Sequence, residues 1–160
     1  MREQPSERIA LDAMKAWKIS AHLVAIILLL LTIGAFVAVY FLDFVPYWAA
    51  SIFAGLSILI WIVSAFIIPK IRWRRWRYQV YDQEIYIQNG ILIVTRTLVP
   101  MIRVQHVDTQ QGPILKRYGL ATLQISTAAT KHEIPALLEE EAAALRDQIS
   151  ELARVEQDDV

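Results

Sequence analysis

The chain contains no cysteine among its 160 residues, which excludes disulfide bonds and thiolate metal ligands. Its formal net charge is zero, so overall charge provides no general attraction to nucleic acid. The sequence also lacks a glycine-rich phosphate loop and a nucleophile elbow, and its three histidines, His22, His106 and His132, lie far apart without metal-ligand spacing. We therefore expect a protein that is not an enzyme, with no catalytic residues, no metal and no cofactor.

Charged residues are also missing from two long apolar stretches, 19–42 and 47–68, which are separated only by residues 43–46. At about 1.5 Å of rise per residue, either stretch as a helix is long enough to cross the hydrocarbon core of a bilayer, which is roughly 30 Å thick. Runs of this length are too long for core helices of a small soluble domain. The sequence therefore predicts a transmembrane helical hairpin over 19–69.

Basic residues flank this hairpin on one side only. Lys15 and Lys18 precede the first helix, whereas the connecting turn carries only Asp43. The second helix is followed by a cluster of five cations: Lys70, Arg72, Arg74, Arg75 and Arg77. The positive-inside rule then predicts a multi-pass protein of the cell (inner) membrane with both termini in the cytoplasm. The same cluster can also serve as a patch for anionic lipid, at about 1 kcal/mol for each exposed cation.

The segment before the hairpin, residues 1–18, is polar with apolar residues at helical spacing, at Ile9, Ala13, Ala16 and Trp17. This pattern predicts a short cytoplasmic amphipathic helix at the membrane surface. The alternative is a frayed tail that becomes helical only near Trp17. The first apolar stretch is about twice the length of a signal-peptide core, so we expect it to act as an uncleaved anchor.

Beyond Arg77 the hydrophobic pattern changes to a period of two, which is typical of β-strands. Asn89-Gly90 favours a tight turn, Pro100 stops a strand, and Gly112-Pro113 interrupts the ladder. The predicted strands cover residues 78–81, 85–88, 91–99, 104–111, 120–127 and 131–134.

The last predicted element is an amphipathic helix, because apolar residues recur at four-three-four-three spacing at Leu138, Ala142, Leu145, Ile149 and Leu152. A lone sheet face must be covered, and this apolar stripe can cover it. The expected fold is thus an α+β membrane protein: a two-helix transmembrane hairpin followed by a bent antiparallel sheet or open barrel with a C-terminal capping helix. We place the cytoplasmic domain at 70–155 and a tail at 156–160.

Several sequence segments resemble a known family. Residues 77–80 read Arg-Tyr-Gln-Val, residues 103–107 read Arg-Val-Gln-His-Val, and residues 119–123 read Gly-Leu-Ala-Thr-Leu. In this order and spacing they resemble the pleckstrin-homology (PH)-like domains of the YdbS-like bacterial membrane family, and the likeness covers nearly the whole chain. The resemblance implies a PH-like fold on a two-helix anchor. Two departures are His106, where a residue such as Asn is expected, and the turn at 127–131, which lacks an expected glycine.

The resemblance to PH domains does not bring phosphoinositide binding with it. Eukaryotic PH domains bind phosphoinositides with basic residues between their first two strands, whereas this loop is short and acidic here, at Asp82-Gln83. A dispersed polar set follows in the most motif-like part of the domain: Arg103, Gln105, His106 and Gln111. These residues are candidates to line a groove; alternatively, they hold strand register.

The resulting functional hypothesis is a non-enzymatic PH-like binding and assembly module, anchored at the cytoplasmic face of the bacterial inner membrane. Its expected partners are membrane lipids together with other membrane proteins or further copies of the chain, and not nucleic acid. The alternative hypothesis is a membrane sensor that binds anionic lipid through the cluster from Lys70 to Arg77.

Overall fold

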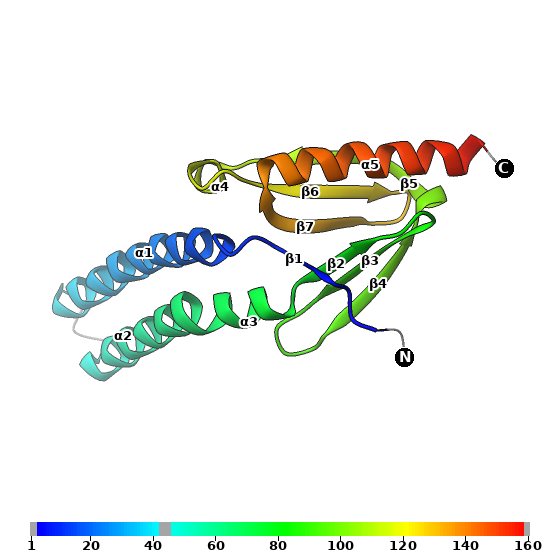
Figure 1. Cartoon of the computed structure of the whole chain (residues 1–160). Coiled ribbons are helices and arrows are strands. Elements are labelled where there is room, and N and C mark those ends of the chain that lie inside the picture. Colours follow the sequence, from blue (N-terminus) through cyan, green and yellow to red (C-terminus); the bar gives the residue numbers. More distant parts are fainter. Residues whose placement is uncertain (1–2, 42–45, 159–160) are drawn as a thin grey trace. The chain divides into compact units, whose positions relative to one another are not determined.

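The computed structural model describes residues 3–41 and 46–158, which form two compact units. One unit is the apolar segment Trp17–Lys70, and the other combines Met1–Ala16 with Ile71–Val160 (Figure 1). The hairpin is therefore an insertion in the sequence of the second unit. The predicted turn at 43–46 lies, except for Pro46, outside the described residues.

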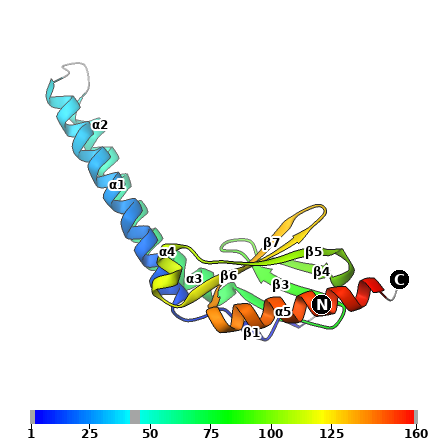
Figure 2. The ribbon, with the colours of Figure 1, turned by 90° about the horizontal axis from the view of Figure 1, so that it is seen from above.

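The apolar unit contains most of α1 (Ala13–Phe41), all of α2 (Tyr47–Ile62) and the π-helical turn η1 (Val63–Ile67). The next helix, α3 (Ile68–Arg75), begins in this unit and ends in the other. The two helices run side by side in both views (Figures 1 and 2). Both helices are strongly apolar, and most of their aliphatic side chains are exposed. By length and composition both helices can span a membrane, as predicted from the absence of charge.

Polar and aromatic side chains connect the two helices at separate levels. Thr32 Oγ1 lies 3.4 Å from Ser57 Oγ. The ring of Trp61 meets His22 edge-on, with 5.9 Å between ring centroids. Gly34 and Gly55 are exposed, and no atom would lie within 4 Å of an added Cβ at either position. These glycines therefore do not mediate a close approach within the hairpin.

The prediction of an amphipathic helix over 1–18 is wrong for the residues before Ala13, where α1 begins. Residues Glu7–Arg8 instead form β1, which pairs antiparallel with β2 (Arg77–Val80). Ile9 is only 2% exposed, and the backbone N–H of Ala10 donates to the carbonyl of Ala136 at 3.1 Å. Ile9, Ala13 and Ala16 are thus buried, and the N-terminal segment pairs with the edge of β2.

The domain contains two antiparallel sheets. The first has the order β1-β2-β3-β4, with β3 at Glu84–Asn89 and β4 at Thr95–Pro100. The second has the order β5-β6-β7, at Val104–Gln110, Leu120–Thr127 and Lys131–Leu138. The 3-10 turn η2 (Met101–Arg103) joins the sheets, and the short helix α4 (Pro113–Arg117) joins β5 to β6. The predicted α+β fold with antiparallel strands is confirmed.

The core lies between the sheets and the last helix, α5 (Glu139–Asp158), which runs along β5 and β6 in Figure 1. The fully buried side chains include Ile85, Leu123 and Ile125 from the strands and Ile149 from α5.

Leu138 does not belong to the helical stripe, because it ends β7 and is 51% exposed. The strand reaches this residue, beyond its predicted end, because a bulge in its register accommodates Pro135.

The strand predicted over 91–99 begins only at Thr95. Asn89 pairs with Thr95, so residues 90–94 form a five-residue loop and not a two-residue turn. Gly90 has a φ of +125°, and a Cβ built on it would lie 1.8 Å from the carbonyl oxygen of Ile93. The loop therefore closes over a position that only glycine can occupy.

Gly90→Ala is expected to lower the free energy of unfolding by about 2 kcal/mol or more, because it adds backbone strain and a clash with a backbone oxygen. The measurement is thermal or denaturant unfolding of the full chain in detergent. Gly112→Ala is the matched control: Gly112 has a φ of −78° and open space at its Cβ position. Equal stabilities of the two variants would contradict this account of the loop.

A hydrogen bond between Tyr78 and Glu141 connects β2 to α5. The Tyr78 hydroxyl donates to Glu141 Oε1 at 2.6 Å in a partly buried position. Burial raises the pKa of Tyr78 well above its usual range, and the hydrogen bond to Glu141 raises it further. The tyrosine therefore stays neutral and keeps donating throughout the physiological pH range.

Tyr78→Phe is expected to cost about 1.5–3 kcal/mol of unfolding free energy at pH 7, because a partly buried carboxylate loses its donor. Since the folded-state pKa is raised, the hydroxyl contributes fully below about pH 10 and progressively less as the pH rises further. The stability gap between wild type and variant should therefore narrow above that pH in denaturant titrations. Tyr86→Phe, whose hydroxyl has no partner among the described residues, is the control. A gap that stays constant with pH would contradict the assignment.

Candidate functional site

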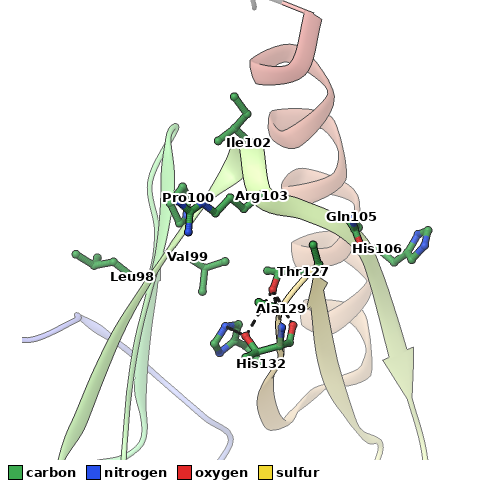
Figure 3. Close-up of a pocket in the computed structure, with 12 residues that line it drawn as sticks. Leu98, Val99, Pro100, Ile102, Arg103, Gln105, His106, Thr127, Ala129 and His132 are labelled. Atoms are coloured by element: carbon green, nitrogen blue, oxygen red, sulfur yellow. Dashed lines mark hydrogen bonds between the residues drawn. The ribbon is translucent and has the colours of Figure 1, made fainter.

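The domain has an open cleft of about 930 Å³ between the end of β4 and the β6–β7 hairpin (Figure 3). We call it the β4–β5 cleft, because η2 and the start of β5 form its base. Figure 3 shows Val99 and Pro100 on one side, and Thr127, Ala129 and His132 on the other. All of these residues belong to the same unit, so the cleft is a feature of the domain itself.

The β4 side of the cleft is apolar, with Leu98 and Ile102 at its rim, where their side chains point away from Thr127 and His132 in Figure 3. Leu98 on β4 is 46% exposed, and Ile102 in η2 is 43% exposed. Pro100 lies between them and ends the strand. Exposed aliphatic side chains at the rim of a concave surface with nearby polar groups are typical of a site that binds another molecule.

The opposite wall is a polar turn with internal hydrogen bonds. The Thr127 hydroxyl donates to the carbonyl of Thr130 at 2.8 Å and accepts from its backbone N–H at 3.0 Å. The Thr130 hydroxyl lies 2.9 Å from His132 Nε2. These bonds hold the turn without the glycine expected there, and they fix the His132 ring at the mouth of the cleft (Figure 3).

The base of the cleft is shaped by an irregularity in β5. Val104 pairs with Thr127 and His106 pairs with Ser126, so Gln105 is an extra residue in the register. Such a bulge changes the direction of neighbouring side chains. Gln105 and His106 both line the cleft as a result, although the His106 ring extends outward from β5 in Figure 3.

Three of the four candidate groove residues thus lie together, because Arg103, Gln105 and His106 all line the β4–β5 cleft. Gln111 lies elsewhere: its side-chain amide donates to the carbonyl of Leu120 at 3.0 Å and to Glu139 Oε2 at 3.1 Å. It links the end of β5 to β6 and α5. The sequence did not identify the apolar wall or His132, since a cleft depends on how two sheets meet.

Outer strands of both sheets lie in the same domain as the cleft. β4 is the last strand of its sheet, and β5 and β7 are the two outer strands of the other. An outer strand has one row of backbone N–H and C=O groups without a partner strand, to which an extended peptide can add.

The five cations from Lys70 to Arg77 do not form one uniform exposed patch. The Arg75 guanidinium donates to the carbonyl of Leu92 at 3.3 Å, and Arg77 donates to the carbonyl of Pro5 at 3.5 Å. Arg72 is half-buried and has interactions of its own. Lys70 and Arg74 are exposed. Part of the cluster therefore has a role within the fold.

The hairpin has a second, largely apolar groove of about 490 Å³ between α1 and α2. Its polar lining consists of His22, Thr32, Ser57 and Trp61. His22 Nδ1 lies 2.6 Å from the carbonyl of Lys18, while the indole N–H of Trp61 is buried without a partner among the described residues. Within 3–41 and 46–158, no group of three or more His, Asp or Glu side chains is arranged to hold a metal.

An antiparallel PH-like domain and two membrane-competent helices define a class of protein: a transmembrane protein with a bacterial PH domain. Comparison with known families agrees, because the model of the family described as "Bacterial PH domain" matches residues 9–153. The chain belongs to this family, which confirms the resemblance seen in the sequence.

The chain is 52% identical to the UPF0699 transmembrane protein YdbS of Bacillus subtilis (strain 168), over the full length of both proteins. It is also 31% identical over 96 residues to the UPF0699 transmembrane protein YdbT of the same organism; the aligned region is 58% of this chain and 19% of that protein. No solved structure matches the chain. Together with the two apolar helices, these relatives identify a transmembrane protein.

Proposed function

We propose that this protein is a non-enzymatic binding and assembly module, in which the β4–β5 cleft recognises an extended segment of another membrane protein. The observation that carries the proposal is the cleft itself. It combines exposed aliphatic side chains, Leu98 and Ile102, with the polar Arg103 and Gln105 and with outer strands that can accept another strand. The domain acts on the cytoplasmic side of the inner membrane, as the basic flanks of the hairpin favour.

An extended peptide fits the chemistry of this cleft better than a small charged ligand does. Along β4, Leu98 faces outward next to the buried Val99, so the strand offers side-chain contacts as well as backbone hydrogen bonds. In peptide binding by strand addition, backbone bonds supply affinity and alternate side chains supply specificity. Arg103 adds a cation at the base, which favours a segment with an acidic residue or a chain carboxylate.

The partner we favour is a membrane protein of related domain content, or a second copy of this chain. In support, a 96-residue segment of this chain matches YdbT, a second transmembrane protein of the organism that contains YdbS. Two membrane proteins with related domains are candidates to assemble through them. Hairpins held in the same bilayer meet at high effective concentration, so even a modest cleft affinity suffices.

The alternative is a sensor of anionic lipid that uses Lys70, Arg72, Arg74, Arg75 and Arg77. Arg75 and Arg77 donate to backbone carbonyls within the domain, which reduces the charge available to a membrane surface. This observation favours the assembly role. If the protein is an assembly module, the full chain should bind its partner equally well in neutral and in anionic bilayers. A lipid sensor would instead require the anionic bilayer.

A photo-crosslinking amino acid introduced at Leu98 in the full chain, in native membranes, is expected to capture a defined membrane protein or a second copy. The control is the same amino acid at Val155, which is 54% exposed on α5. Adding Ile102→Asp should reduce capture at position 98 about tenfold or more, because a charge enters the apolar wall. Mass spectrometry identifies the adducts. Equal adducts at both positions, or no effect of Ile102→Asp, would refute the role of the cleft.

A further inference from the structure

We propose that residues 91–94 of the β3–β4 loop insert into the interfacial region of the bilayer that the hairpin spans. We call it the aliphatic loop. This membrane contact is distinct from the β4–β5 cleft, and it is made by aliphatic side chains and not by the charges of the basic cluster. Its partner is a lipid surface, and specifically the acyl chains below the headgroups.

The loop exposes four consecutive aliphatic residues. Ile91 and Val94 are 36% and 42% exposed, and Leu92 and Ile93 are 90% and 81% exposed. No charged or polar side chain interrupts the run. An isolated exposed leucine needs no explanation, but a protruding loop tip composed entirely of aliphatic residues marks a surface that leaves water.

The loop is held in a defined conformation. Gly90 allows the tight approach to the carbonyl of Ile93 at its base. Arg96 Nε donates to Gln88 Oε1 at 3.0 Å, and the Gln88 side-chain amide donates to the carbonyl of Arg75 at 3.4 Å. The Arg75 guanidinium in turn donates to the carbonyl of Leu92 at 3.3 Å. Arg75 is therefore connected both to the loop itself, at Leu92, and to the strand pair at its base, through Gln88.

Along the chain, the residue that holds the loop is close to the membrane-spanning stretch. Arg75 is the last residue of α3, which begins at Ile68, the last residue of the uncharged stretch. Seven residues of α-helix cover roughly 10 Å, which is comparable to the thickness of one headgroup region. A loop tethered through so short a helix can reach the interfacial region, where acyl chains offer an apolar phase to its side chains.

A lipid occupant fits this surface better than a protein does. Residues 91–94 are not part of a strand, so they offer no ladder for an added strand. The loop also has no charged side chain to select a protein partner. Insertion of hydrophobic side chains requires only an apolar phase. The bilayer that the hairpin spans provides such a phase.

The absence of native cysteine allows a direct test in the full chain. Leu92→Cys is labelled with an environment-sensitive fluorophore and reconstituted into bilayers of neutral phosphatidylcholine, with and without quenchers attached to the acyl chains. Val155→Cys, equally labelled on exposed α5, is the matched control. Ile93→Cys repeats the measurement at the neighbouring position.

Insertion predicts blue-shifted emission at positions 92 and 93, and acyl-chain quenching several times greater there than at position 155. The quenching should persist when anionic lipid replaces part of the neutral lipid. Equal quenching at the loop and at position 155 would overturn the proposal. A blue shift without acyl-chain quenching would also overturn it, because a protein surface would then cover the loop. Quenching that requires anionic lipid would assign the membrane contact to the basic cluster and refute insertion by the loop.

Discussion

The cost of placing charge or unpaired backbone in hydrocarbon is the constraint on which the rest of this protein depends. Two helices of 29 residues, Ala13–Phe41 and Tyr47–Arg75, satisfy their own backbone groups and carry uncharged stretches long enough to span a bilayer. The serine and threonine hydroxyls in these stretches have local partners: Thr32, for example, donates to the carbonyl of Leu28 at 2.8 Å. The charged residues are thereby confined to the flanks of the two stretches.

The domain accommodates this hairpin as an insertion between two paired strands. β1 precedes α1 and β2 follows α3, and Arg8 pairs with Arg77 in the antiparallel register. The two ends of the hairpin are thus joined to neighbouring strands of one sheet. Because β1 has only two residues, its pairing depends on the burial of Pro5 and Ile9 on either side of it. Membrane anchoring and the folding of the domain are therefore coupled through a short strand.

Much of this architecture could be predicted from the sequence, because strong patterns reflect local physics. The uncharged stretches identified the hairpin, strict alternation identified β6, and the four-three spacing identified α5. The predictions failed where long-range pairing competes with local pattern. Ile9, Ala13 and Ala16 fit a helical period, yet Ile9 belongs to the sheet side of the domain. The tract 91–94 has strand-like residues but no partner strand, since the pairing of Asn89 with Thr95 excludes it. The apolar wall of the cleft depends on the meeting of two sheets, which no local pattern contains.

The most direct test of this account is a disulfide between β1 and β2 in the membrane-embedded chain. Arg8→Cys and Arg77→Cys occupy directly paired positions, and such pairs in antiparallel strands have Cα separations within disulfide range. The account predicts that the double variant, reconstituted in bilayers, forms an intramolecular disulfide in mild oxidant and keeps its unfolding cooperativity. Failure of this pair to form a disulfide, while Gln4→Cys with Arg77→Cys forms one readily, would contradict the insertion of the hairpin between paired strands.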